Sequence, residues 1–132
     1  MNLKLICMGK RNILVVDDSP VMRRMIIKTI RLCQFDLGEI FEAGNGVEAL
    51  QEIEKNAMDL LFLDINMPEM DGIELLTRIR KMDKYNTVPI FIISTESNQN
   101  RIDYIKSQNA DFLHKPFTPE DLRRKISQLE TN

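Results

Sequence analysis

The sequence is poor in residues that bind soft metals or form cross-links. It contains one histidine, His114, and two cysteines, Cys7 and Cys33, which lack the paired spacing of a zinc site. The simplest interpretation is a reduced cytosolic protein with Cys33 in the core, and a disulfide is the less favoured alternative. We interpret His114 as incidental, because a histidine that carries phosphate would be exposed on a helix and not placed between a strand and a loop.

Long apolar runs and an excess of one charge are also absent. No run reaches the length of a membrane span, and residues 3–8 are too short for a signal peptide, with Lys10 and Arg11 on the wrong side of them. The 18 basic and 20 acidic residues give a net charge of -2, so nothing draws the whole chain to nucleic acid or anionic lipid. We expect a cytoplasmic protein that neither inserts into a membrane nor binds nucleic acid directly.

The length of the chain allows one domain. Its 132 residues can bury one core of ordinary size and leave no room for a second domain of similar weight. The periodic pattern begins only after Arg11, and no linker, repeat or low-complexity tract interrupts it. We therefore predict an N-terminal extension over residues 1–11 and one domain over residues 12–130.

Short apolar runs alternate with segments of helical spacing along this domain. Each helical segment opens with a capping residue and places its apolar residues on one face. The fourth segment, roughly Asn98 to Gln108, has only Ile102 and Ile105 as aliphatic anchors, so we expect it to be the loosest. The predicted strands are 13–16, 39–43, 60–63, 90–93 and 112–113, and the capping residues are Ser19, Asn45, Asp71, Asn98 and Thr118. The core positions expected on the other helices are Met22, Ile26, Ile30, Cys33, Ala49, Leu50, Ile53, Leu75, Leu76, Ile79, Met82, Leu122, Ile126 and Leu129.

This alternation of strand and helix predicts an α/β fold. Right-handed crossover connections lead to a doubly wound parallel sheet of five strands with five helices on its two faces. The sequence alone does not fix the order of the strands. In the flavodoxin-like order 2-1-3-4-5, the first and third strands are neighbours, and Asp17, Asp18 and Asp64 would meet at the switch point between them.

Polar side chains follow four of the predicted strands, at the end where open α/β sheets bind ligands. Asp17 and Asp18 follow the first strand, Asp64 follows the third and Ser94 follows the fourth. Lys115 comes just after the last strand. Taken singly, each is compatible with an ordinary turn residue or a solvated charge. Because they close separate strands, we interpret them together as one site.

The chemistry of such a cluster indicates a hard cation and a phosphoryl group. Carboxylates about 4 Å apart repel by roughly 4 kcal/mol per pair at an effective dielectric constant of about 20, and a cation relieves this repulsion. Oxygen ligands favour Mg²⁺, which keeps waters and binds phosphate oxygens. Asp64 would then attack phosphorus, with the Asn66 backbone carbonyl as a further metal ligand. Lys115 and Ser94 would bind phosphoryl oxygens.

The residues around these strand ends form four motifs. They are Ile13-Leu14-Val15-Val16-Asp17-Asp18-Ser19 with Met22-Arg23-Arg24, Leu63-Asp64-Ile65-Asn66-Met67-Pro68 with Met70-Asp71-Gly72, Ile92-Ile93-Ser94-Thr95-Glu96, and Phe112-Leu113-His114-Lys115-Pro116-Phe117. Together they are highly specific. Through them the chain closely resembles the receiver domain of two-component response regulators, and most of all the stand-alone, chemotaxis-type (CheY-like) members, over nearly everything after Arg11.

The resemblance implies a phosphorylation site and its metal. Asp64 would accept a phosphoryl group from a histidine kinase. Mg²⁺ would be held by Asp17, Asp18 and Asp64 together with the carbonyl of Asn66, and Lys115 would contact the phosphoryl group. Such a protein promotes its own phosphorylation and dephosphorylation, and it is not a turnover enzyme.

The resemblance also implies a conformational switch. The Ser94 hydroxyl would move to the phosphoryl group, and Phe112 would swing into the vacated space and so remodel a surface for a partner. Three downstream roles stay open: a chemotaxis regulator that binds the flagellar motor switch, a relay carrier that passes phosphate to a phosphotransfer protein, and a regulator of some enzyme.

The sequence departs from the usual pattern at three positions. Ser94 stands where threonine is commoner, and Phe112 replaces the tyrosine of the chemotaxis type, which removes a hydroxyl. Asn109 stands where glycine is usual, and asparagine tolerates left-handed geometry. Asn66 and Glu96, near the path of an attacking water, match the chemotaxis type and indicate a short-lived phosphate.

One alternative comes from a different class of protein. A small phosphatase of the haloacid-dehalogenase type also uses an aspartate nucleophile and Mg²⁺. Such an enzyme needs a second aspartate two residues after the nucleophile as its acid and base. Asn66 stands at that position and cannot transfer the proton, so this alternative fits worse.

Overall fold

The structure, a computed structural model, describes residues 10–33, 36–67 and 70–131, with side chains as far as residue 128. Cys7, Pro68 and the side chain of Leu129, which carried expectations above, lie outside the described residues. Five parallel strands form one sheet in the order β2-β1-β3-β4-β5, which confirms the predicted fold class and strand order. The strands are β1 Arg11–Val16, β2 Leu37–Ala43, β3 Leu60–Asp64, β4 Ile90–Ser94 and β5 Asp111–His114.

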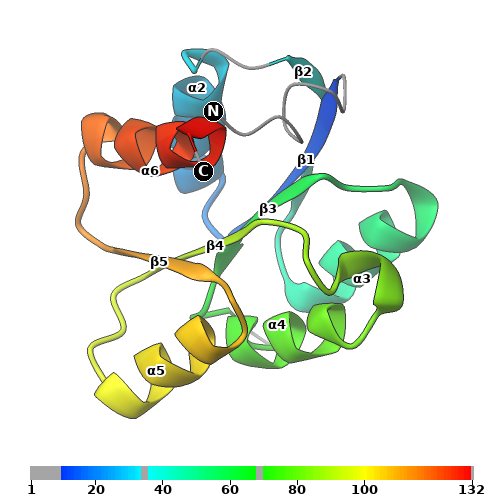
Figure 1. The fold of residues 1–132 in the computed structure, drawn as a ribbon, viewed down its shortest axis with the longest axis vertical. Helices are drawn as coiled ribbons and strands as arrows, with labels where there is room; N and C mark the ends of the chain where they lie inside the picture. Colours follow the sequence, from blue (N-terminus) through cyan, green and yellow to red (C-terminus); the bar gives the residue numbers. More distant parts are fainter. Residues whose placement is uncertain (1–9, 34–35, 68–69, 132) are drawn as a thin grey trace.

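Helices cover both faces of this sheet. They are α2 Pro20–Arg31, α3 Gly46–Lys55, α4 Gly72–Arg80, α5 Gln99–Ser107 and α6 Pro119–Thr131, with a short 3-10 helix, η1, over Asp83–Tyr85. Helices α2 and α6 lie on one face, and α3, α4 and α5 lie on the other (Figure 1). The sheet is therefore the middle of three layers.

The two faces of the central strands supply two separate cores. Leu14 and Val16 of β1 pack on the side of α3, α4 and α5, whereas Ile13 and Val15 pack on the side of α2 and α6. Every residue of β3 and β4 is buried, as expected for strands covered on both faces. Since burial of a large aliphatic side chain stabilises by roughly 1.5–3 kcal/mol, these two strands fix the central part of the sheet.

Each predicted capping residue opens its helix. A side-chain oxygen accepts a hydrogen bond from a backbone N–H of the first turn, which satisfies a donor that the helix itself leaves unpaired. These bonds are Met22 N to Ser19 Oγ, Glu48 N to Asn45 Oδ1, Glu74 N to Asp71 Oδ1, Arg101 N to Asn98 Oδ1 and Asp121 N to Thr118 Oγ1. The caps follow the carboxyl ends of the strands, so they also fix the loops that carry the polar residues.

Some element ends, and the depth of some core positions, differ from expectation. Cys33 lies just beyond the end of α2 at Arg31 and is half-buried, packed against the core on the side of α2 and α6. Met22, Leu50 and Met82 are likewise half-buried and packed against the core. Strand β2 starts at Leu37, ahead of the predicted 39–43, and its first residue pairs with Arg11. Arg11-Asn12 and Leu37-Gly38 alternate poorly between apolar and polar, so the pattern did not indicate these strand starts.

Candidate functional site

Three carboxylates meet at the carboxyl ends of β1 and β3. These strands are neighbours, with Val16 paired to Leu63, so the residues that end or follow them lie side by side. Asp17, Asp18 and Asp64 each offer an oxygen within 4.8 Å of the other two. Asp17 and Asp64 are buried, whereas Asp18 is exposed. The structure thus brings together the three acids that the sequence placed in one site.

Lys115, which follows the edge strand β5, bridges two of these acids. Its Nζ lies 3.4 Å from Asp17 Oδ2 and 3.6 Å from Asp64 Oδ1. The Lys115 backbone N–H donates to the Ser94 carbonyl at 2.7 Å, which ties the end of β5 to the end of β4. The Lys115-Pro116 peptide bond is cis. One ammonium therefore offsets part of the charge of three carboxylates.

The environment of Asp64 favours its protonated form. Burial is the largest cause and the charge of Asp17 the second, and together with a smaller effect of Asp18 they raise the pKa of Asp64 from 3.8 to about 6. Lys115 and the backbone N–H of Asn66, which donates to Asp64 Oδ1 at 3.4 Å, act in the opposite direction. The acid that the sequence singles out is thus the one whose ionised form is poorly solvated.

Ser94 is fully buried at the end of β4, one strand away from Asp64. In the β3–β4 ladder Asp64 pairs with Ile93, so Ser94 lies one residue beyond this pair. The Ser94 Oγ accepts a hydrogen bond from the backbone N–H of Glu96 at 3.1 Å. Its own hydroxyl proton is then available for another acceptor. The amide of Asn66 donates to Thr95 Oγ1 at 3.3 Å, which links this loop to the one after Asp64.

The donor set of this cluster suits a hard cation. The three ligand groups are carboxylates alone, with no histidine or cysteine among them. Oxygen ligands of this kind bind Mg²⁺, Ca²⁺ or Mn²⁺, whereas zinc and copper favour nitrogen and sulfur. The cluster can therefore hold a divalent cation that compensates the repulsion between its carboxylates.

Comparisons with known proteins agree with this geometry. Residues 13–127 match the response regulator receiver domain. The chain belongs to that family. It is 39% identical over 119 residues to the chemotaxis protein CheY homolog of Campylobacter jejuni, covering 89% of this chain and 90% of that one. It is 37% identical over 116 residues to chemotaxis protein CheY1 of Helicobacter pylori, covering 86% and 92%.

A solved structure shows the same arrangement of elements. The chemotaxis response regulator CheY4 of Vibrio cholerae superposes with a TM-score of 0.80 at 31% identity, covering 92% of this chain and 99% of that one. This protein is therefore a CheY-like response regulator of two-component signal transduction. No helix among the described residues of the receiver is long and apolar enough to span a membrane.

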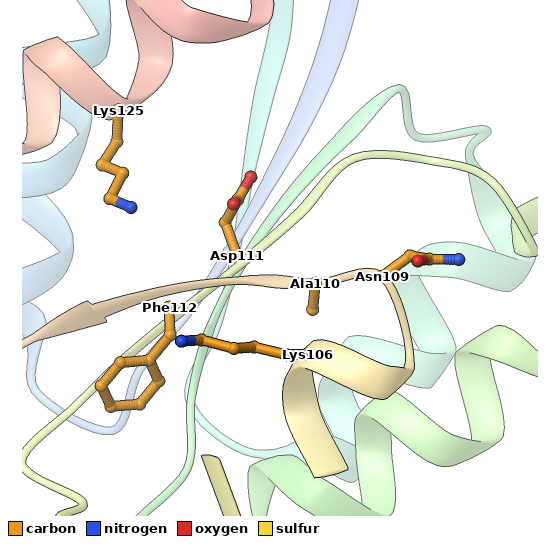
Figure 2. Close-up of a pocket in the computed structure, with 6 residues that line it drawn as sticks. All are labelled: Lys106, Asn109, Ala110, Asp111, Phe112 and Lys125. Carbon is orange, nitrogen blue, oxygen red and sulfur yellow. The ribbon is translucent and has the colours of Figure 1, made fainter. Parts of the chain in front are cut away.

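The receiver exposes part of Phe112 on the side of β5. Phe112 is half-buried against the core of α3, α4 and α5. It helps to line a pocket of about 410 Å³ between α5, β5 and α6, with Lys106, Asn109, Ala110, Asp111 and Lys125. Figure 2 shows Phe112 and Asp111 leaving β5 in opposite directions, Phe112 on the side of Lys106 and Asp111 on the side of Lys125. Asn109, just before this strand, has φ 57°, so the left-handed geometry expected there is confirmed.

Three residues at this site received no role from the sequence. A Cβ on Gly72 would lie 2.2 Å from the Asp64 carbonyl oxygen, so only glycine lets the start of α4 pack against Asp64. Arg23 donates to the Asp17 carbonyl at 2.5 Å and to Glu42 Oε1 at 2.8 Å. Arg101 Nε lies 2.6 Å from Glu96 Oε1. Each acts through a contact between a helix or helix start and a neighbouring loop or strand, which residue spacing does not indicate.

Proposed function

We propose that the receiver accepts a phosphoryl group on Asp64 from a histidine kinase and that this modification switches its binding to a partner. The observation that carries the proposal is the bridging ammonium of Lys115 among three carboxylates whose oxygens lie within 4.8 Å of one another. A site that concentrates negative charge around one buried, partly neutralised carboxylate fits transfer of an anionic group with the help of a cation.

The proposed cation is Mg²⁺, with Asp17, Asp18, Asp64 and the Asn66 carbonyl as its ligands. When bound, it would neutralise charge on the carboxylates and on the phosphoryl oxygens. It would also favour the ionised form of Asp64, which burial otherwise disfavours. The all-oxygen donor set supports this choice.

Each of the remaining residues has a distinct proposed task. One Asp64 oxygen forms a bond to phosphorus while the N–P bond of the donor phosphohistidine breaks, and the imidazole nitrogen keeps the electron pair. Lys115 needs only a small movement to contact a phosphoryl oxygen, since its Nζ already lies 3.6 Å from Asp64. Ser94 donates its free hydroxyl proton to another oxygen. Phe112 then repacks and changes the surface of α5, β5 and α6.

The partners follow from the same proposal. The likeness to chemotaxis proteins over most of the chain supports a role in chemotaxis, in the cytoplasm. The downstream target is then a flagellar motor switch, with a phosphotransfer protein or a regulated enzyme as alternatives. The balanced charge supports a protein target over nucleic acid. We also propose 12–130 as the bounds of the receiver domain. The protein would promote its own phosphorylation and dephosphorylation without being a turnover enzyme.

The experiment is labelling with acetyl phosphate and Mg²⁺, followed by intact mass. We expect one phosphoryl group per chain, lost with EDTA and in Asp64→Asn but kept in Asp103→Asn, which removes an exposed carboxylate from α5. Labelling that persists in Asp64→Asn or in EDTA would refute the assignment. In Lys115→Ala we expect phosphorylation to be retained and the partner response to weaken. Capture of proteins on bait treated with beryllofluoride, compared with untreated bait, would distinguish the three kinds of target.

A further inference from the structure

Arg101 of α5 approaches acids from the two loops that border the site, the loop after β4 and the loop after β3. Its Nε is 2.6 Å from Glu96 Oε1, and its Nη2 is 4.0 Å from Asp71 Oδ2. Lys115 pairs instead with Asp17 and Asp64. Arg101 therefore supplies the positive charge that faces Glu96.

Both acids adjoin residues that the proposed reaction uses. The Glu96 backbone N–H donates to Ser94 Oγ, so the Glu96 side chain and the Ser94 hydroxyl belong to one short loop. Asp71 precedes Gly72, whose N–H donates to the Ile65 carbonyl at 2.9 Å, and Gly72 packs directly on the backbone of Asp64. Arg101 thus connects the loop after β4 to the loop after β3.

The contact between Arg101 and Glu96 matters because the site already carries much negative charge. Three carboxylates converge at the ends of β1 and β3, and Glu96, two residues after Ser94 in the loop after β4, is a fourth acid whose side chain is only 19% exposed. A phosphodonor reaches the site as an anion. A carboxylate released from its cation at this position would repel the donor, and it would do so more strongly than at a fully solvated site.

We propose that Arg101 is a positioning residue for phosphoryl transfer: it neutralises Glu96 and holds this carboxylate away from the path of the incoming anionic donor, without touching the phosphoryl group itself. The proposal rests on the proposed function, in which an Asp64 oxygen bonds to phosphorus. With an acyl phosphate as donor, the P–O bond to the acyl group breaks and the carboxylate leaves with the electron pair.

The test compares initial rates of labelling by acetyl phosphate in Arg101→Gln and Arg78→Gln. The control removes an arginine of the same charge, which pairs with Glu74 on the exposed surface of α4. We expect Arg101→Gln to be slower by about three- to tenfold at low ionic strength. The difference should fall to about twofold or less at roughly 1 M salt, where the screening length is about 3 Å. Arg101→Lys should restore most of the rate.

A double-mutant cycle separates this role from a structural one. If Arg101 acts through Glu96, Arg101→Gln should have little effect in a Glu96→Gln background, and the effect should be smaller with phosphoramidate, which carries less negative charge than acetyl phosphate. An equal loss in both backgrounds, or equal rates in Arg101→Gln and Arg78→Gln, would overturn this inference alone. Wild-type protein that takes up no label on Asp64 would overturn the proposed function as well.

Discussion

Replacement of Asp64 by asparagine measures how much the buried Asp64 carboxylate destabilises the folded protein. The substitution keeps the shape of the side chain and removes its charge, so it relieves the causes that raise the pKa of Asp64: burial, the neighbouring Asp17 and, to a smaller extent, Asp18. We therefore expect Asp64→Asn to be more stable than the wild-type protein when no divalent cation is present.

The size of this gain follows from the shift. A pKa that rises from 3.8 to about 6 corresponds to about 3 kcal/mol at about 1.36 kcal/mol per unit. Asp64 is 4% exposed, so little solvent screening reduces this value, although the amide gives up the attraction to Lys115. We expect a gain of about 1–3 kcal/mol in the free energy of unfolding at pH 7.5.

The pH dependence has a definite sign. Because the folded-state pKa is raised, the folded protein binds this proton more tightly than the unfolded chain does. The destabilisation is absent well below pH 3.8, grows between pH 3.8 and about 6, and is complete above about 6. The advantage of Asp64→Asn should therefore shrink as the pH falls through this window.

The assay is urea unfolding in EDTA, followed by far-ultraviolet circular dichroism because the chain has no tryptophan. Asp103→Asn, which removes an exposed carboxylate on α5, is the matched control and should change little. Addition of Mg²⁺ should stabilise the wild-type protein, and it should stabilise Asp64→Asn much less. A variant that is no more stable than wild type at pH 7.5, or a gain that is the same at pH 4 and pH 7.5, would refute the electrostatic argument.

Three further substitutions test contacts between distant segments by urea unfolding. Gly72→Ala should lower the free energy of unfolding by about 1–3 kcal/mol and slow phosphorylation, because its Cβ would clash with the Asp64 carbonyl oxygen. Gly44→Ala, whose Cβ would lie 3.7 Å from Glu48 Oε1, should do neither. Arg80→Met should cost about 2–4 kcal/mol, since Arg80 donates to the carbonyls of Tyr85, Val88, Gln108 and Asn109; a loss below about 0.5 kcal/mol would contradict this role. Tyr104→Phe should cost about 1 kcal/mol by removing the 2.6 Å hydroxyl contact with Thr77, and unchanged stability would show that solvent replaces it.

The sequence predicted the sheet and the position of the acids because both depend on local signals. The apolar runs of β3 and β4 are unbroken, and each helix cap lies within four residues of the N–H that it binds, so these elements follow from their own residues. Asp17 and Asp64 converge once the strand order is known, because they stand at the ends of neighbouring strands.

Other features depended on contacts that no local pattern records. Arg80 lies on an amphipathic helix where an arginine usually faces solvent, yet it binds carbonyls 28 and 29 residues further along the chain. The role of Gly72 becomes visible only when α4 is placed against Asp64. Cys33 packs against the core but is only half-buried, since the helical spacing continued past the point at which α2 ends.

The anchoring of α5 is uneven, and this sets the direction in which the helix can move. Its fixed contacts gather at its carboxyl end, where Ile105 is buried, Tyr104 meets Thr77, and Arg80 holds the carbonyls of Gln108 and Asn109. At the other end, Arg101 reaches back to Glu96 beside the phosphoryl site. We expect a helix held in this way to pivot about its last turn and not to slide as a rigid body. A rearrangement of the loop after Ser94 would therefore swing the amino end of α5 outward. Amide hydrogen exchange would reveal this movement as fast exchange at residues 99–103 and slow exchange at residues 105–109.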